Sequence, residues 1–293
     1  MDNHSNNQSP TLSTLESGAT APAPAPPAST WRDRFDLRER PELWLVPAVF
    51  VAVIAIWEVS VNVFDIESFV LPPPSEIVEK LWMQLQSDLF WGHLWVTTQE
   101  TLIGFAIGVT VAFVLGTLIS QFDLVEKTLM PYVVMFQTVP KVALAPLFVV
   151  WFGFGLTSKI VMAAVISFFP MLINVIEGLR SADADRIQML RVFGASEAQV
   201  FRMVRLPSAT PFIFAGLDIG IVFAILGAVV GEFIGAQEGL GYLLLQTNYN
   251  FDIAGMFAIL VVLSVMGLVA HGTIRLIQHK VAFWAQDNRV IAA

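Results

Sequence analysis

The chain has 293 residues, of which 56% are hydrophobic, 14% are charged and none is cysteine, and its formal net charge is −8. Soluble globular domains carry roughly 25% charged residues, so this composition indicates a protein whose main solvent is the lipid bilayer. The absence of cysteine excludes disulfides, cysteine-ligated metals and thiol catalysis.

The N-terminal segment, residues 1–41, is predicted to be a disordered tail that ends in a short basic stretch. Its first thirty residues are polar and rich in proline, alanine, serine and threonine, with too little bulky apolar surface to form a core. They lack the basic start and the apolar centre of a cleavable signal peptide. The first membrane span is therefore expected to act as an uncleaved insertion signal.

Residues 42–280 are predicted to form one all-α membrane domain with six transmembrane helices. Each of six apolar segments approaches or exceeds the ~20 residues that a helix needs to cross the hydrocarbon. These segments are residues 43–64, 97–120, 129–151, 158–179, 209–233 and 254–277. The third contains Pro131, Pro140 and Pro146, each of which removes a backbone donor, so this span is expected to be kinked or split into two half-helices.

The basic residues predict the orientation of these spans. With the N-terminus inside, thirteen lysines and arginines fall on the inner side, against Lys80 and Lys159 in outer loops, while Lys141 lies within a span. Positive residues in short loops mark the cytoplasmic side. Both termini, including the tail at 281–293, are therefore predicted to be cytoplasmic.

Two local patterns concern packing. In the long outer connection, "LPPPSEIVEKLWMQLQ" contains Ser75 and Glu76, which could begin a short helix at the membrane interface. The second span has Gly104 and Gly108 at a four-residue interval, with Gly116 two turns further. Small residues at this spacing allow two helices to approach closely, so we expect tight packing along this face.

The sequence gives little support to an enzyme. It has no phosphate-binding loop, no HExxH motif and no nucleophile elbow, and its four histidines are scattered. We therefore expect no catalytic residue, no metal site and no cofactor. His93, at the outer edge of a span, is interpreted as an interfacial anchor.

Four ionisable residues inside the spans are the candidates for a gate or a solute pathway: Glu100, Lys141, Asp218 and Glu232. A charge within the bilayer is unfavourable, so such residues commonly mark function. Lys141 and Asp218 lie at comparable depths and could pair, face water or contact a polar substrate. For Glu100 and Glu232, nearer the span ends, exposure to headgroups or to a wet vestibule is the favoured interpretation.

The inner connection at 181–205 has the pattern of two short amphipathic helices. Asp183 is positioned to cap the first, Gly194 suits a left-handed termination, and Ser196 with Gln199 forms a capping-box pattern for the second. Leu206-Pro207 is expected to end that second helix before span five. About twenty-five residues exceed what a simple turn needs, so the apolar stripe requires a partner: this chain's own helix ends or another protein.

From about residue 40 to 280 the chain resembles the permease subunits of bacterial ABC importers. Their cytoplasmic signature is Glu-Ala-Ala, three residues, Gly, nine residues, Ile, one residue and Leu-Pro. Here Gly194, Val204, Leu206 and Pro207 stand at those spacings, whereas residues 188–190 read Gln-Met-Leu. "LPPPSEI", "PKVALAPLFVVWFGFGLTSKI", "FFPMLINVIEGLRS" and "ILGAVVGEFIGAQEGLGYLL" resemble the branch that handles sulfonates, taurine, nitrate and pyrimidine precursors.

This resemblance implies a type I importer permease in the bacterial inner membrane. It implies a homodimer embedded in lipid, two copies of a separate ATP-binding subunit that hydrolyses ATP, an extracytoplasmic solute-binding protein, and no contact with nucleic acid. The loop at about 181–207 would supply the coupling helix that docks on the ATPase. The contact candidates carried over to this loop are Gln188, Leu190, Arg191, Gly194, Ala195, Ser196, Leu206 and Pro207.

The solute stays open between two classes. "GAVVGEFIGAQEGLGYL", together with Glu100, is most similar to members that import pyrimidine precursors of thiamine or riboflavin, and sulfonate, taurine or nitrate import is the alternative. An ion-coupled secondary transporter, with Lys141 and Asp218 relaying protons or ions, is the alternative from another class. An integral-membrane enzyme would need a clustered polar site, which the sequence pattern does not reveal.

Overall fold

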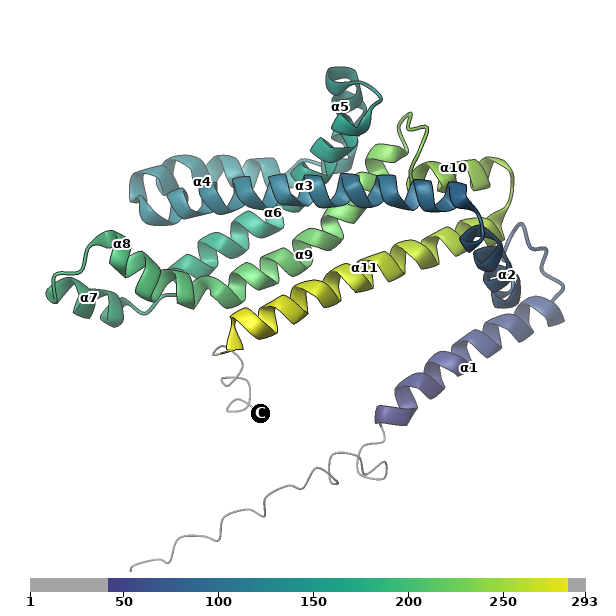
Figure 1. Ribbon diagram of the computed structural model, residues 1–293, viewed down its shortest axis with the longest axis horizontal. Helices are drawn as coiled ribbons and strands as arrows, with labels where there is room; N and C mark the ends of the chain where they lie inside the picture. Colours follow the sequence, from purple (N-terminus) through teal and green to yellow (C-terminus); the bar gives the residue numbers. More distant parts are fainter. Residues whose placement is uncertain (1–41, 284–293) are drawn as a thin grey trace, which may run out of the picture. The chain divides into compact units, whose positions relative to one another are not determined.

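The computed structural model describes residues 42–283, and the predictions for residues 1–41 and 284–293 lie outside them. Within this range every regular element is a helix. In chain order the elements are α1 (Glu42–Val63), α2 (Pro74–Leu85), α3 (Asp88–Gln121), α4 (Asp123–Thr138), η2 (Lys141–Leu144), α5 (Ala145–Phe152), α6 (Leu156–Arg180), α7 (Ala184–Val192), α8 (Glu197–Val200), η3 (Phe201–Arg205), α9 (Leu206–Glu232), α10 (Leu240–Tyr249) and α11 (Ile253–Val281). Figure 1 labels the eleven α-helices of this range.

The chain divides into two units, residues 1–53 and residues 54–293. In the first unit the described part is the beginning of α1, an apolar helix whose side chains from Trp44 to Val53 are all exposed. The second unit contains the rest of α1 and all the other helices. Such exposed apolar surface is what the hydrocarbon of a bilayer accommodates, since lipid tails are as apolar as the side chains.

The prediction of six membrane spans is confirmed, with the third one broken. Five helices are long and apolar enough to cross a membrane, and the pair formed by α4 and the η2–α5 segment gives the sixth when counted as one span. The two members of this pair meet at an angle of 85°. The break falls at Val139 and Pro140, which have extended backbone, as the proline content predicted.

The core of the second unit lies where α6 packs against α3 on one side and α9 on the other, while α11 lies along α9 (Figure 1). The glycines of α3 make the first contact close. A Cβ atom on Gly104 would come 2.5 Å from the Cβ of Ala163, and one on Gly108 would come 2.6 Å from the carbonyl oxygen of Ala164. The predicted close packing is confirmed, and no larger side chain fits here without movement.

The two ends of this unit carry different short helices (Figure 1). We call them the α10 end, where α10 and α2 lie, and the α7–α8 end. The short helix predicted near Ser75 is present, although it begins at Pro74 and Ser75 does not cap it. Instead Ser75 donates two hydrogen bonds to Glu58 of α1, from its amide at 3.0 Å and from its hydroxyl at 2.8 Å.

One boundary prediction is wrong: Leu206-Pro207 does not end a helix. Helical backbone continues from Glu197 to Glu232. The residues just before the proline adopt a π-helical turn, in which the Leu206 amide donates to the carbonyl of Phe201 five residues back. This wider turn accommodates a residue without an N–H group, so the proline lies in the first turn of α9 without a break.

Candidate functional site

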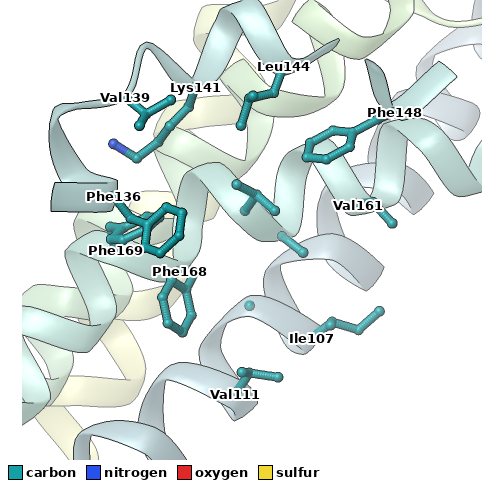
Figure 2. Close-up of a pocket in the computed structure, with 13 residues that line it drawn as sticks. Ile107, Val111, Phe136, Val139, Lys141, Leu144, Phe148, Val161, Phe168 and Phe169 are labelled. Carbon is teal, nitrogen blue, oxygen red and sulfur yellow. The ribbon is translucent and has the colours of Figure 1, made fainter. Parts of the chain in front are cut away.

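The broken span borders a cavity of about 560 Å³ between α3, α4, η2, α5 and α6 (Figure 2). Its lining is almost entirely apolar, and four of the side chains are the aromatic rings of Phe136, Phe148, Phe168 and Phe169. This volume is within the range of about 300–1,000 Å³ typical of small-molecule sites. Flat aromatic walls of this kind favour stacking with a planar ring system.

Lys141 is the one charged side chain among the residues that line this cavity. The break in the span starts the η2 turn at this residue, and its ammonium group donates to the Gln137 carbonyl at 3.0 Å. The same group lies 4.7 Å from the centre of the Phe169 ring, which is cation–π distance. Figure 2 shows Lys141 at the aromatic wall formed by Phe136 and Phe169.

The possible pairing of Lys141 with Asp218 is not observed. Asp218 lies in α9, and its carboxylate contacts Nδ1 of His271 in α11. Comparable depth along two spans did not indicate which face each residue occupies. The helix break directs Lys141 to the side of α6, while Asp218 is on the side of α9 that meets α11.

At the α10 end, side chains from two other helices cap the start of α10. The carboxylate of Glu232 in α9 accepts hydrogen bonds from the amides of Gly241 and Tyr242. The first amides of a helix have no partner within the helix, and a negative group near them is stabilised by the helix dipole. Glu232 is 1% exposed, so the expected exposure to headgroups or a vestibule is wrong.

Two residues of α3 complete this cap. The amide of Leu240 donates to the hydroxyl of Thr97 at 2.8 Å, and that hydroxyl donates to Glu232 at 2.6 Å. The amide of Gly239 donates to Nδ1 of His93 at 2.9 Å. His93 is thus a buried acceptor rather than the interfacial anchor that its position suggested.

Glu100 and Lys159 lie beside this cap and are also buried, at 1% and 2% exposure. For Glu100, the exposure favoured by its position near a span end is therefore wrong as well. Lys159 is not in an outer loop but in the first turn of α6, and its ammonium group donates to the carbonyls of Phe154 and Gly155. This group interacts electrostatically with both Glu100 and Glu232. A second cavity, of about 340 Å³, borders Glu100 and Lys159.

At the α7–α8 end, the predicted local structure is confirmed. Asp183 caps α7 by accepting from the Asp185 amide at 2.9 Å, and Gly194 has a φ of +82°. Ser196 and Gln199 form both hydrogen bonds of the capping box. Arg191 pairs with Glu197 at 2.8 Å, which joins the two short helices.

The apolar side chains of this loop remain largely uncovered by the described part of the chain. Met189, Val192, Phe193 and Met203 are between 55% and 80% exposed. Val200 is fully buried, and Ile187 and Leu190 are half-buried. Packing on the chain's own helix ends therefore accounts for only part of the stripe.

Sequence reasoning missed Thr97, Lys159 and His271 as partners of the candidate residues. One signal was available: His93, Thr97, Glu100 and Gly104 recur at spacings of four, three and four residues, which places them on one face of a helix. Lys159 and His271 gave no comparable signal, because their partners are far away in the sequence.

The family of the chain follows from comparison with known proteins. Residues 101–283 match the family described as "Binding-protein-dependent transport system inner membrane component". The chain belongs to this family and is a permease subunit of an ABC importer, which confirms the resemblance inferred from the sequence. Permeases of this class work with ATP-binding subunits and substrate-binding proteins.

Several relatives are named for the solute that they import. A formylaminopyrimidine transport permease of Halalkalibacterium halodurans is 34% identical over 82% of this chain and 95% of its own length. A riboflavin transport permease of Chloroflexus aurantiacus is 35% identical over 84% of this chain and 91% of its own length. A putative aliphatic sulfonates transport permease of Bacillus subtilis is 33% identical over 82% of this chain and 86% of its own length. These names therefore include both solute classes suggested by the sequence.

Solved structures agree with the fold. The inward-facing MetNI methionine ABC transporter matches with a TM-score of 0.58 and 24% identity over 64% of this chain and 94% of the other. An amino acid ABC transporter solved with histidines matches with a TM-score of 0.57 and 18% identity, over 69% of this chain and 98% of the other. At these identities the likeness concerns the fold, which is that of ABC importer permeases.

Proposed function

We propose that this protein is the inner-membrane permease of an ATP-driven importer for a planar nitrogen heterocycle, either a thiamine pyrimidine precursor or riboflavin. The aromatic cavity beside the broken span carries this proposal. Its four phenylalanine rings offer flat apolar walls, and the ammonium group of Lys141 lies at the edge of this wall, on the Gln137 carbonyl and the Phe169 ring. The two relatives named for formylaminopyrimidine and riboflavin support the same class.

A sulfonate such as taurine is the second candidate, because Lys141 also favours it. An ammonium group at the edge of an apolar cavity attracts an anionic headgroup. However, an aliphatic sulfonate would leave most of the aromatic wall without a stacking partner. The importer that takes sulfonates is thus expected to need fewer aromatic residues than this cavity contains.

ATP hydrolysis belongs to separate subunits in this proposal, and the α7–α8 end is the docking element. Its exposed Met189, Val192 and Phe193 offer an apolar surface for a groove on the ATPase. The contact candidates Gln188, Leu190, Arg191, Gly194, Ala195, Ser196, Leu206 and Pro207 lie in or beside this element. The α7–α8 end and both termini then face the cytoplasm, and the α10 end faces the solute-binding protein.

The asymmetry of basic residues supports this orientation more strongly than the sequence suggested. Lys159 is buried within α6 and does not count as a loop charge, so Lys80 is the one basic residue left on the outer side of the described chain. We further propose that two copies form the pathway, with the exposed apolar surfaces facing lipid or the second copy.

Uptake into vesicles tests the proposal. The permease is reconstituted with its ATPase and with its solute-binding protein added on the other side, and labelled formylaminopyrimidine, riboflavin and taurine are supplied separately. We expect ATP-dependent accumulation of one of the two heterocycles and none of taurine. Accumulation of taurine alone would contradict the proposed solute. Accumulation driven by an ion gradient without the ATPase would instead indicate a secondary transporter.

A further inference from the structure

The buried carboxyl groups of Glu100 in α3 and Glu232 in α9 form a pair that the proposed solute site does not use. Both side chains are 1% exposed, and a hydrogen bond joins their carboxyl groups. An ionised carboxylate contains only acceptors, so two ionised groups cannot form this bond. One proton must therefore lie between the two glutamates.

The donors around the pair indicate which glutamate carries the proton. Glu232 accepts from the hydroxyl of Thr97 at 2.6 Å and from the first amides of α10. Within the described part of the chain, Glu232 is the hydrogen-bond partner of Glu100, whose Oε2 is buried and has none. Donors stabilise the charged form of an acid, and a buried charge without them is strongly unfavourable. Glu232 is therefore the carboxylate, and Glu100 is the acid that donates to it.

Lys159 in α6 balances the charge of this pair. Its ammonium group is bound to the carbonyls of Phe154 and Gly155, and it interacts electrostatically with both carboxyl groups. With Glu100 neutral, the negative charge of Glu232 and the positive charge of Lys159 cancel inside the protein. A second carboxylate would leave an uncompensated charge in a buried position, which is strongly unfavourable.

Three further titratable groups surround the pair: His93, Tyr242 and Glu238. His93 accepts from the Gly239 amide through Nδ1 at 2.9 Å, so its ring is neutral. This ring lies 5.7 Å from the ring of Tyr242 in α10, and it interacts electrostatically with Glu238 in the loop before α10. Within the described part of the chain, Lys159 is thus the positive charge that faces the pair.

We propose that the α10 end contains a proton-binding site, in which a proton on Glu100 joins α3 to α9 and holds the carboxylate that caps α10. Loss of this proton places two negative charges in contact between α3 and α9 and weakens the cap. The proton is therefore a structural ligand of the fold, and the α10 end loosens as the surroundings become alkaline. This role is independent of the solute that the permease carries.

Infrared spectroscopy of the purified permease, in a detergent without ester groups, tests the site directly. At neutral pH exposed carboxyl groups are ionised, so a carboxylic-acid C=O band comes from a buried acid. We expect this band in the wild type and in Glu79→Gln, a control at an exposed carboxylate of α2, and its loss in Glu100→Gln. Full intensity of the band in Glu100→Gln would overturn the proposal. Absence of the band from the wild type would do so as well, and this measurement is decisive even if Glu100→Gln does not fold.

The pH dependence of chemical unfolding in detergent provides a second readout. The folded protein keeps a proton that Glu100 of the unfolded chain releases, so stability should fall as pH rises. Glu100→Gln retains a donor to Glu232 but has no proton to lose. From about pH 7 to about pH 8, above the ordinary range of His93, the unfolding equilibrium constant of the wild type should rise about tenfold relative to that of Glu100→Gln. Glu79→Gln should follow the wild type, and the same pH dependence in all three proteins would contradict the proposal.

The two glutamine variants together check which glutamate holds the proton. Glu100→Gln should unfold close to the wild-type temperature at neutral pH, because its amide still donates to Glu232. Glu232→Gln should unfold at a clearly lower temperature, since its amide group turns an N–H toward either Thr97 or the first amides of α10, which are themselves donors there. Equal losses in the two variants would overturn the assignment of the proton to Glu100.

Discussion

The helices α8 and α10, at opposite ends of α9, both begin with capped amides, but the capping groups come from different distances along the chain. At α8 the partners are Ser196 and Gln199, three residues apart and both exposed. At α10 they are Glu232, Thr97 and His93, which are buried and up to 146 residues away. The first cap orders a local loop, whereas the second also joins α3, α9 and α10.

The polar groups at the α10 end contribute to the stability of the fold, whereas the α7–α8 end leaves its side chains accessible to a partner. The α10 end places its polar groups inside the protein, where removal of one leaves others unsatisfied. The α7–α8 end keeps its caps in solvent and leaves apolar side chains exposed, as a docking element requires. Substitutions at the two ends should therefore differ in size even where the chemistry removed is the same.

The largest effect is expected for Glu232→Ala. This change removes the acceptor for the amides of Gly241 and Tyr242 and the partner of Thr97, and it leaves Lys159 with one fewer negative neighbour. We expect a loss of about 3 kcal/mol or more in unfolding free energy. Glu197→Ala at the other end removes an exposed ion pair and should change it by less than about 1 kcal/mol.

Thermal unfolding of the purified variants in detergent provides the measurement. The midpoint should fall strongly for Glu232→Ala and hardly at all for Glu197→Ala. Equal shifts for the two glutamates would mean that burial of the cap at α10 does not contribute to stability in the way proposed.

The next effect separates two glycines with positive φ. At Gly239, φ is +110°, and an added Cβ would collide with the carboxyl group of Glu232. At Gly194, φ is +82°, and an added Cβ would meet nothing within 4 Å. Gly194→Ala should destabilise by about 1–2 kcal/mol from backbone strain alone. Gly239→Ala should destabilise by about 2–4 kcal/mol, since overpacking adds to the strain.

Two readouts distinguish these glycine variants. The unfolding midpoint should fall further for Gly239→Ala than for Gly194→Ala. Co-purification with the ATPase should weaken for the bulkier, β-branched Gly194→Val, which alters the turn between α7 and α8. If Gly194→Val retained full ATPase capture and solute-stimulated ATP turnover, the assignment of this loop as the docking element would be wrong.

The same contrast explains how far the sequence could predict this protein. The spans follow from apolar length, the break at Pro140 from proline chemistry, and the caps of α7 and α8 from residues two or three positions apart. The partners of Glu100, Glu232 and Asp218 depend on which helix faces meet after folding. Depth along a span, which the sequence supplies, does not determine this, so burial was predicted wrongly for both glutamates.

The last comparison concerns two hydroxyl caps. Ser196→Ala removes an exposed hydroxyl that accepts from the Gln199 amide at 3.4 Å, while the Ser196 amide still donates to the Gln199 side chain. We expect Ser196→Ala to lower the free energy of unfolding by about 0.5–1 kcal/mol. Thr97→Val keeps the shape of a buried side chain but removes both the acceptor of the Leu240 amide and the donor to Glu232. We expect a loss of about 2 kcal/mol in unfolding free energy, since the buried Leu240 amide is left unpaired and the buried Glu232 loses one of its donors.

Hydrogen exchange of individual amides can resolve what a global unfolding midpoint cannot. In Thr97→Val the Leu240 amide loses its partner, so faster exchange should spread through the first turn of α10 and into the contacts with α3. In Ser196→Ala faster exchange should stay within the first turn of α8. If both variants loosened only their own helix, the long-range cap would act as a local one, and the difference between the two ends would reduce to burial alone.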